Sequence, residues 1–67
     1  MLLMINGKST EVTDDNRTLA DLISLPEWSG RLMIIERNGE IVSKENYRDT
    51  ILSEGDRIEL VHFVGGG

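Results

Sequence analysis

Two Asn-Gly dipeptides constrain the fold of this chain most, because each predicts a tight reversal between two extended segments. In a two-residue type I′ turn both central residues take a positive φ, which asparagine and glycine tolerate best. Asn6-Gly7 follows the apolar run Leu2–Ile5, and residues 9–12 are expected to return from it as a second strand. The chain therefore begins with a predicted β-hairpin.

One helix is predicted between two clear boundaries. Thr18 is suited to cap its N-terminus, and Asp21 follows three residues later, which is the spacing of a capping box. Pro26 disfavours a helical conformation for the residue before it, so the helix should end at about Leu25. The apolar face of this helix consists of Leu19, Leu22 and Ile23.

The sequence of the second half of the chain predicts shorter elements. These are a central strand over residues 32–35, a tight turn at Asn38-Gly39, a strand over Glu40–Val42, a helical turn over residues 43–47, a turn at residues 54–56 and a final strand over residues 57–64. Ser43 should cap the helical turn, with Tyr47 folded back on the core. Because regular helices do not alternate with the strands, we predict an α+β fold with a mixed sheet instead of a doubly wound parallel sheet.

The length of 67 residues allows one small domain. Such a chain hides only about 60% of its unfolded surface, which leaves little interior for a ligand pocket of several hundred cubic ångströms. We therefore expect a carrier or binding module that is not itself an enzyme. Trp28 is expected to cover an edge of the small core. The chain has no cysteine, so it offers no disulfide, thiolate metal site or thiol nucleophile.

The formal net charge of −5 argues against nucleic acid as a partner, because phosphates require a basic surface. A basic protein partner fits this charge, and so does a simple role in solubility. We expect no metal site, since His62 is the only histidine and the spacing of Asp14, Asp15 and Asp21 matches no EF-hand loop. The apolar start lacks the basic segment of a signal peptide, and no stretch is long enough to span a bilayer, so we expect a cytoplasmic protein without membrane contact.

Three glycines, Gly65-Gly66-Gly67, follow the final strand directly. Glycine has no Cβ and accepts either sign of φ, so a glycine tail is suited to enter a narrow slot. Three extended residues reach about 10 Å, far enough to carry a carboxylate from the domain into another protein's active site. A frayed end is the alternative interpretation of the same residues.

Together, the Asn6-Gly7 hairpin, the helix over residues 18–25, the turn at residues 54–56 and the strand that runs into glycines resemble the ubiquitin-like sulfur-carrier family. The resemblance covers the full length and implies a β-grasp fold, with four to five strands curled around one main helix and a short second helical turn. It divides the chain into a β-grasp domain (residues 1–64) and a flexible tail (residues 65–67). Residues 35–42, 44–45 and 61–67 are most similar to the ThiS branch, which supplies sulfur for the thiazole ring of thiamin.

The resemblance implies a reaction at Gly67. In the family, an E1-like activating enzyme uses ATP and Mg to adenylate the terminal carboxylate, and a sulfur donor such as a cysteine desulfurase converts it to a thiocarboxylate. Thiazole synthase then receives the sulfur. Gly65 and Gly66 would thread into the partner. Gly65 is one glycine more than the usual pair, and it would either lengthen the tail or be a tolerated extra residue. The carrier itself binds no cofactor.

Strand alternation predicts a docking surface for such partners. If Leu3, Ile35 and Leu60 face the helix, their neighbours face the opposite side of the sheet. The predicted partner-binding patch consists of Met4, Ile34, Val61 and Phe63. A register shifted by one residue would exchange the two faces.

Three other functions remain open on these residues. The sulfur could serve molybdopterin or another pathway, since the small subunit of molybdopterin synthase shares the fold and the final Gly-Gly. The chain could instead be a ubiquitin-like modifier that is conjugated to lysines through Gly67. A passive adaptor would use the sheet face alone, with no chemistry at the tail.

Overall fold

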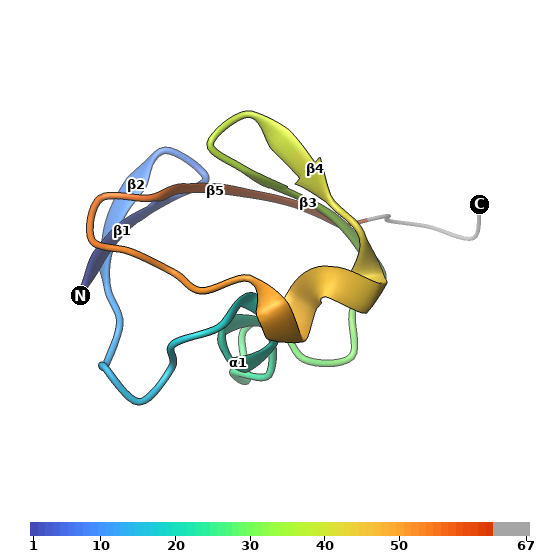
Figure 1. The fold of residues 1–67 in the computed structure, drawn as a ribbon, viewed down its shortest axis with the longest axis horizontal. Coiled ribbons are helices and arrows are strands. Elements are labelled where there is room, and N and C mark those ends of the chain that lie inside the picture. Colours follow the sequence, from blue (N-terminus) through green and yellow to red (C-terminus); the bar gives the residue numbers. More distant parts are fainter. Residues whose placement is uncertain (63–67) are drawn as a thin grey trace.

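A computed structural model describes residues 1–62 and contains a five-stranded sheet with one α-helix and one 3₁₀ helix. In chain order the elements are β1 (Leu2–Ile5), β2 (Lys8–Glu11), α1 (Leu19–Ile23), β3 (Met33–Arg37), β4 (Glu40–Val42), the 3₁₀ helix η1 (Lys44–Asp49) and β5 (Arg57–His62). The sheet order is β2-β1-β5-β3-β4, in which β1 and β5 are parallel and the other neighbours antiparallel. The sheet curves over α1 (Figure 1), which confirms the predicted mixed sheet of the β-grasp fold.

Both Asn-Gly turns are present with the predicted backbone. The φ angles are 50° and 82° at Asn6 and Gly7, and 52° and 88° at Asn38 and Gly39. The first return strand begins one residue earlier than predicted, because the two-residue turn leaves Lys8 directly opposite Ile5. The turns therefore set the register of both hairpins.

The capping box of α1 forms as predicted. The Thr18 hydroxyl accepts a hydrogen bond from the Asp21 N–H, and the Asp21 carboxylate accepts one from the Thr18 N–H, both at 3.1 Å. The helix is shorter than predicted and ends at Ile23. Beyond it the backbone tightens, since the N–H groups of Ser24 and Leu25 donate to carbonyls only three residues back.

Replacing Thr18 should destabilise the domain through this cap. Thr18→Ala leaves the Asp21 N–H without its side-chain acceptor, and we expect a loss of about 1 kcal/mol, equivalent to a fall in melting temperature of roughly 4–8 °C for a domain of this size. Thermal denaturation followed by circular dichroism measures the effect. Ser9→Ala removes an exposed hydroxyl from β2 and should change the melting temperature far less; equal values for the two variants would contradict the role of the cap.

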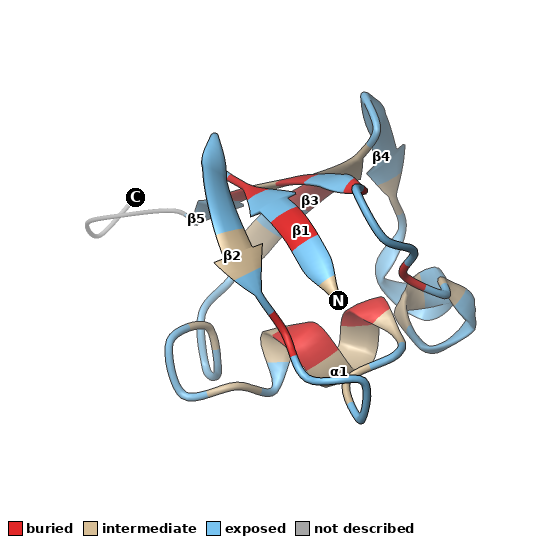
Figure 2. Cartoon of the chain, turned by 90° about the vertical axis from the view of Figure 1, so that its left-hand side faces the viewer, coloured by how far each residue is buried: buried red, intermediate tan, exposed pale blue. Residues whose placement is uncertain are grey.

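The core lies between α1 and the inner face of the sheet. Alternate residues of β1 and β5 are buried, as is Ile35 in the middle of β3 (Figure 2), so the register is not shifted from the predicted one. The buried apolar residues are Leu3, Ile5, Val12, Leu19, Leu22, Ile35, Leu52, Ile58 and Leu60. Half-buried Trp28 and Tyr47 pack against this cluster, as expected.

Three details of the second half differ from the prediction. The central strand begins at Met33, not Leu32, and continues to Arg37, because Glu36 and Arg37 pair with both β4 and β5. The predicted Ser43 side-chain cap is wrong, since the backbone carbonyl of Ser43 accepts the Asn46 N–H at 2.8 Å and the side chain makes no capping bond. The helical turn also extends further than predicted, to Asp49.

No helix within residues 1–62 is both long and apolar enough to cross a membrane.

Candidate functional site

The candidate site begins at the C-terminal end of β5, which leads to the glycine tail. β5 is a central strand, paired with β3 from Met33 opposite His62 to Arg37 opposite Ile58. On its other edge the ladder with β1 reaches only Ile58. The last described residues of β5 therefore need a second anchor on the β1 side.

The side chain of Asn6 supplies that anchor. Its Oδ1 accepts the Leu60 N–H at 2.7 Å, its Nδ2 donates to the Leu60 carbonyl at 3.2 Å, and its own N–H donates to the Ile58 carbonyl at 2.9 Å. Sequence reasoning assigned Asn6 only to the turn. No local pattern could have identified this role, because Asn6 and Leu60 are 54 positions apart.

The outer face of the sheet is apolar where we predicted a patch. Met4, Ile34 and Val61 are 38%, 42% and 55% exposed, although each has at least one buried neighbour in its strand. Ile34 and Val61 are directly opposite each other in the β3–β5 ladder. Leu2 and Ile41 add exposed apolar surface to the same face, and the prediction omitted both.

Several predicted site residues lie outside the described residues. These are Phe63 of the partner-binding patch and the tail residues Gly65, Gly66 and Gly67. Their assigned roles stay predictions, as does the boundary between a domain of residues 1–64 and a tail of residues 65–67.

A buried ionic group holds the start of β5. The Asp56 carboxylate, 7% exposed as a residue, accepts hydrogen bonds from Arg37 Nε at 2.9 Å, Asn38 Nδ2 at 3.1 Å and the Ser53 N–H at 2.8 Å. Burial raises the pKa of this carboxyl, but the hydrogen bonds from Ser53, Asn38 and Arg37 together outweigh burial and hold the pKa below 3.8. The group ties the turn before β5 to the β3–β4 hairpin.

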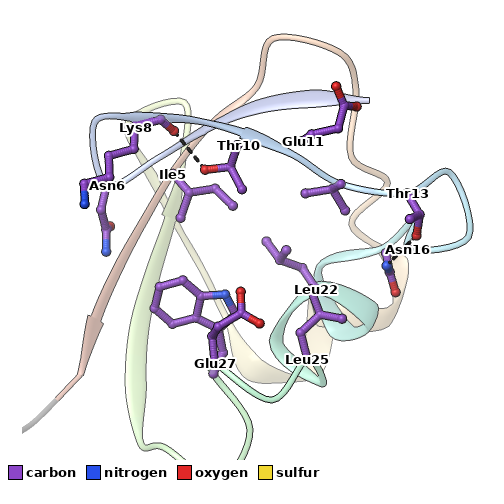
Figure 3. Close-up of a pocket in the computed structure, with 12 residues that line it drawn as sticks. Ile5, Asn6, Lys8, Thr10, Glu11, Thr13, Asn16, Leu22, Leu25 and Glu27 are labelled. Carbon is purple, nitrogen blue, oxygen red and sulfur yellow. Dashed lines mark hydrogen bonds between the residues drawn. The ribbon is translucent and has the colours of Figure 1, made fainter.

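A groove of about 470 Å³ lies on the helix side of the sheet, between β2 and the segment after α1 (Figure 3). Its apolar walls include Ile5, Val12, Leu22, Leu25 and Trp28. The groove is partly open to solvent, whereas the expectation from chain length concerned a pocket within the interior. The groove lies at the edge of the core, since Ile5, Val12 and Leu22 belong to the buried cluster.

The groove offers little for catalysis. Its ionisable lining residues are Lys8, Glu11 and Glu27, without histidine or cysteine. In addition, residues 1–62 contain no group of three or more His, Cys, Asp or Glu side chains arranged to hold a metal ion. The outer face and the end of β5 are therefore the better candidates for function.

Known protein sequences resemble this chain over almost its entire length. Residues 3–67 match the model of the ThiS family. The chain is 42% identical over 66 residues to the sulfur carrier protein ThiS of Bacillus subtilis, an alignment that covers 98% of this chain and 100% of that protein. It is also 36% identical over 67 residues to a thiazole synthase of Paramagnetospirillum magneticum, of which it spans only 20%.

Solved structures give the same result. The crystal structure of the thiamine biosynthesis protein ThiS from Geobacter metallireducens superimposes with a TM-score of 0.82 at 30% identity, and the match covers 100% of both chains. A solution structure of a thiamine biosynthesis protein from the same organism matches with a TM-score of 0.78 at 32% identity, over 100% of this chain and 88% of that one. Fold, length and sequence thus agree along the whole chain, which belongs to the ThiS family.

Proposed function

We propose that this chain is a sulfur carrier protein for thiazole formation in thiamin biosynthesis, and that it acts as a co-substrate of other enzymes. The observation that carries this proposal is the family match over residues 3–67, which includes the glycine tail. The relative that aligns over its entire length and is named a sulfur carrier supports it further. In this proposal the carbonyl carbon of Gly67 holds the sulfur, as suits a chain without cysteine.

The chemistry at Gly67 requires activation. A terminal carboxylate has a pKa of about 3.5, so at neutral pH it is an ionised, resonance-stabilised and poor electrophile. An ATP- and Mg-dependent partner would join the carboxylate to AMP with release of pyrophosphate. A persulfide, supplied by a cysteine desulfurase, would then attack the carbonyl carbon and displace AMP, and a thiol reductant would cleave the sulfur–sulfur bond to leave the thiocarboxylate.

The described residues suit the carrier's part of this reaction. Asn6 and β3 hold β5 from both edges, which gives the tail a fixed base. The apolar outer face lies on the same strand and can bind the activating enzyme, since exposed apolar patches of this kind commonly mark protein interfaces. Docking there would bring the carboxylate within reach of ATP, and the absence of a Cβ at Gly65 and Gly66 would let the tail enter a narrow slot.

Thiazole synthase is the proposed acceptor of the sulfur. A sequence similar to the whole of this chain occurs within two longer proteins named thiazole synthase, each of which is spanned only to 20%. Domains joined in one polypeptide in some organisms commonly act together, which supports a direct complex. The need for ATP at the activating step supports a cytoplasmic location.

Intact-mass measurement tests the proposal. After incubation with ATP, Mg, a cognate activating enzyme, a sulfur donor and a thiol, the chain should gain the mass difference between sulfur and oxygen, and fragmentation should assign it to Gly67. Persistence of the unmodified chain with every cognate activating enzyme would contradict the proposal. Recovery of Gly67 joined to lysines of other proteins would indicate a modifier instead.

A charged residue on the outer face should weaken binding to the activating enzyme without unfolding the domain. Val61→Asp places a carboxylate in the proposed apolar interface, and we expect the dissociation constant for the activating enzyme to rise about tenfold or more. Because Val61 is 55% exposed, the free energy of unfolding should change by only about 1 kcal/mol or less. Isothermal titration calorimetry and thermal denaturation measure the two quantities.

Ile51→Asp is the matched control. Ile51 is 59% exposed, similar to Val61, but it lies outside the strands and bridges Thr18 near α1. This variant should bind the activating enzyme as the parent chain does. Equal weakening by both variants would mean that the outer face is not the docking surface.

A further inference from the structure

Two carboxylates face each other on the outer surface of the sheet. Glu36 of β3 and Glu59 of β5 are directly opposite in the antiparallel ladder. Both side chains point outward, because the residues beside them, Ile35, Ile58 and Leu60, are buried on the inner face. Opposed residues have Cβ atoms about 4.5–5.5 Å apart, and like charges in that position are destabilising.

No cation of the described part of the chain forms an ion pair with Glu36 or Glu59. The ion pairs found within residues 1–62 join the N-terminus to Glu11 and Asp14, and Arg37 to Asp56. Arg57 lies two residues before Glu59 on the same face, yet it forms no ion pair within 4.0 Å there. The free chain thus tolerates a repulsion on its outer face.

The carboxylate pair lies inside the apolar docking surface. The next outward-facing pair of the same ladder is Ile34 opposite Val61, and Ile41 of β4 is opposite Glu36. Glu36 and Glu59 are only half-exposed. A partner that covers these apolar residues would also remove water from both carboxylates, which is costly unless the partner supplies a positive charge.

We propose that an arginine of the activating enzyme bridges Glu36 and Glu59 when the outer face docks, an inference that rests on the function proposed above. Arginine suits the site better than lysine, because its planar guanidinium presents several donors in a fixed fork and can bond two carboxylates at once. The apolar residues then provide contact area, while the carboxylate pair selects a partner with a correctly placed cation.

The double variant Glu36→Gln/Glu59→Gln tests this inference, because it should weaken binding to the activating enzyme without weakening the fold. The dissociation constant for the activating enzyme should rise about tenfold or more, since hydrogen bonds to charged groups are worth more than neutral ones. Its dependence on salt should also become weaker than that of the parent chain. Relief of the repulsion should leave the melting temperature of the free variant unchanged or a few degrees higher.

Glu40→Gln/Glu45→Gln is the matched control, because it removes the same charge from two exposed residues of β4 and η1. Its affinity and salt dependence should stay close to those of the parent chain. A Glu36/Glu59 variant that binds as tightly as the parent at every salt concentration would overturn the inference. A lower melting temperature of this variant would also overturn it, because it would mean that a cation of the chain itself already stabilises the two carboxylates.

The outcomes separate this inference from the proposed function. If the parent chain becomes a thiocarboxylate and Val61→Asp weakens binding, while the Glu36/Glu59 variant binds normally, only the arginine bridge is wrong. If the parent chain is never activated at Gly67, the proposed function itself fails.

Discussion

A chain that lacks Gly67 should lose sulfur loading and keep its fold. One residue contributes at most about 3.3–3.6 Å to the reach of an extended tail. Since a misplacement of about 1 Å can slow a reaction roughly a hundredfold, the shortened carboxylate should be adenylated at least about a hundredfold more slowly. Release of pyrophosphate in the presence of the activating enzyme measures this rate.

The same variant distinguishes a carrier from a passive adaptor. Gly67 follows the described domain, so its removal should leave both the melting temperature and the affinity for the activating enzyme near those of the full chain. An adaptor that used only the sheet face would retain its biological role without Gly67. Normal support of thiazole formation by the shortened chain would therefore exclude chemistry at the tail.

Loss of the Asp56 carboxylate should produce the largest fall in stability among the substitutions considered. Asp56→Ala leaves the Arg37 guanidinium, the Asn38 amide and the Ser53 N–H without their shared acceptor. Removal of one partner of a buried, hydrogen-bonded ion pair costs about 3 kcal/mol or more; the 32% exposure of the Arg37 side chain keeps the value at the lower end. Urea denaturation measures the free energy of unfolding.

Asp49→Ala is the matched control, since Asp49 is an exposed carboxylate at the end of η1. Its substitution should change the free energy of unfolding by about 0.5 kcal/mol or less. Similar losses in the two variants would show that the network around Asp56 contributes no more than an ordinary surface charge.

The lowered pKa of the Asp56 carboxyl implies that the stability of the domain depends on pH. This pKa is lower in the folded chain than its ordinary value of 3.8, so the folded state binds the proton less readily than the unfolded state. The stabilisation is therefore complete above pH 3.8 and is lost as the pH falls below that value through the folded pKa. An Asp56→Asn variant should show a flatter acid limb in urea denaturation series.

Local chemistry made much of the fold predictable. The Asn-Gly turns set the two hairpins, the spacing of Thr18 and Asp21 indicated the start of α1, and alternation assigned the inner and outer faces. These features depend on residues close together in the chain, so their physics can be recognised from the sequence. The resemblance to a family added the β-grasp topology and the role expected of the tail.

The errors arose where neighbouring groups compete or where partners are distant. Pro26 suggested a helix as far as Leu25, but i−3 hydrogen bonds replace the α-helical pattern at Ser24. At Ser43 the backbone carbonyl, and not the hydroxyl, takes the bond that was expected of the cap. The groove beside Trp28 was not predicted in either direction, because it depends on side-chain volumes across α1 and β2, which periodicity does not report.

The contacts that support the candidate site were also missed for reasons of distance. Asn6 reaches Leu60 across 54 positions, and Arg37 reaches Asp56 across 19. Asn6, Arg37 and Asp56 each lie in a turn or at a strand end. A role in the turn was enough to explain their presence in the sequence, so no distant partner was expected. Only the packing of the sheet shows that they hold both ends of β5.

Transfer of labelled sulfur tests the central claim most directly. The chain would be loaded at Gly67 with a heavy sulfur isotope, purified as the thiocarboxylate and mixed with thiazole synthase and its remaining substrates. The account predicts that the heavy isotope appears in the thiazole product in proportion to the carrier consumed, while Gly67 returns to a carboxylate. A thiazole that forms without the label, or a label that stays on the chain while thiazole accumulates, would contradict it.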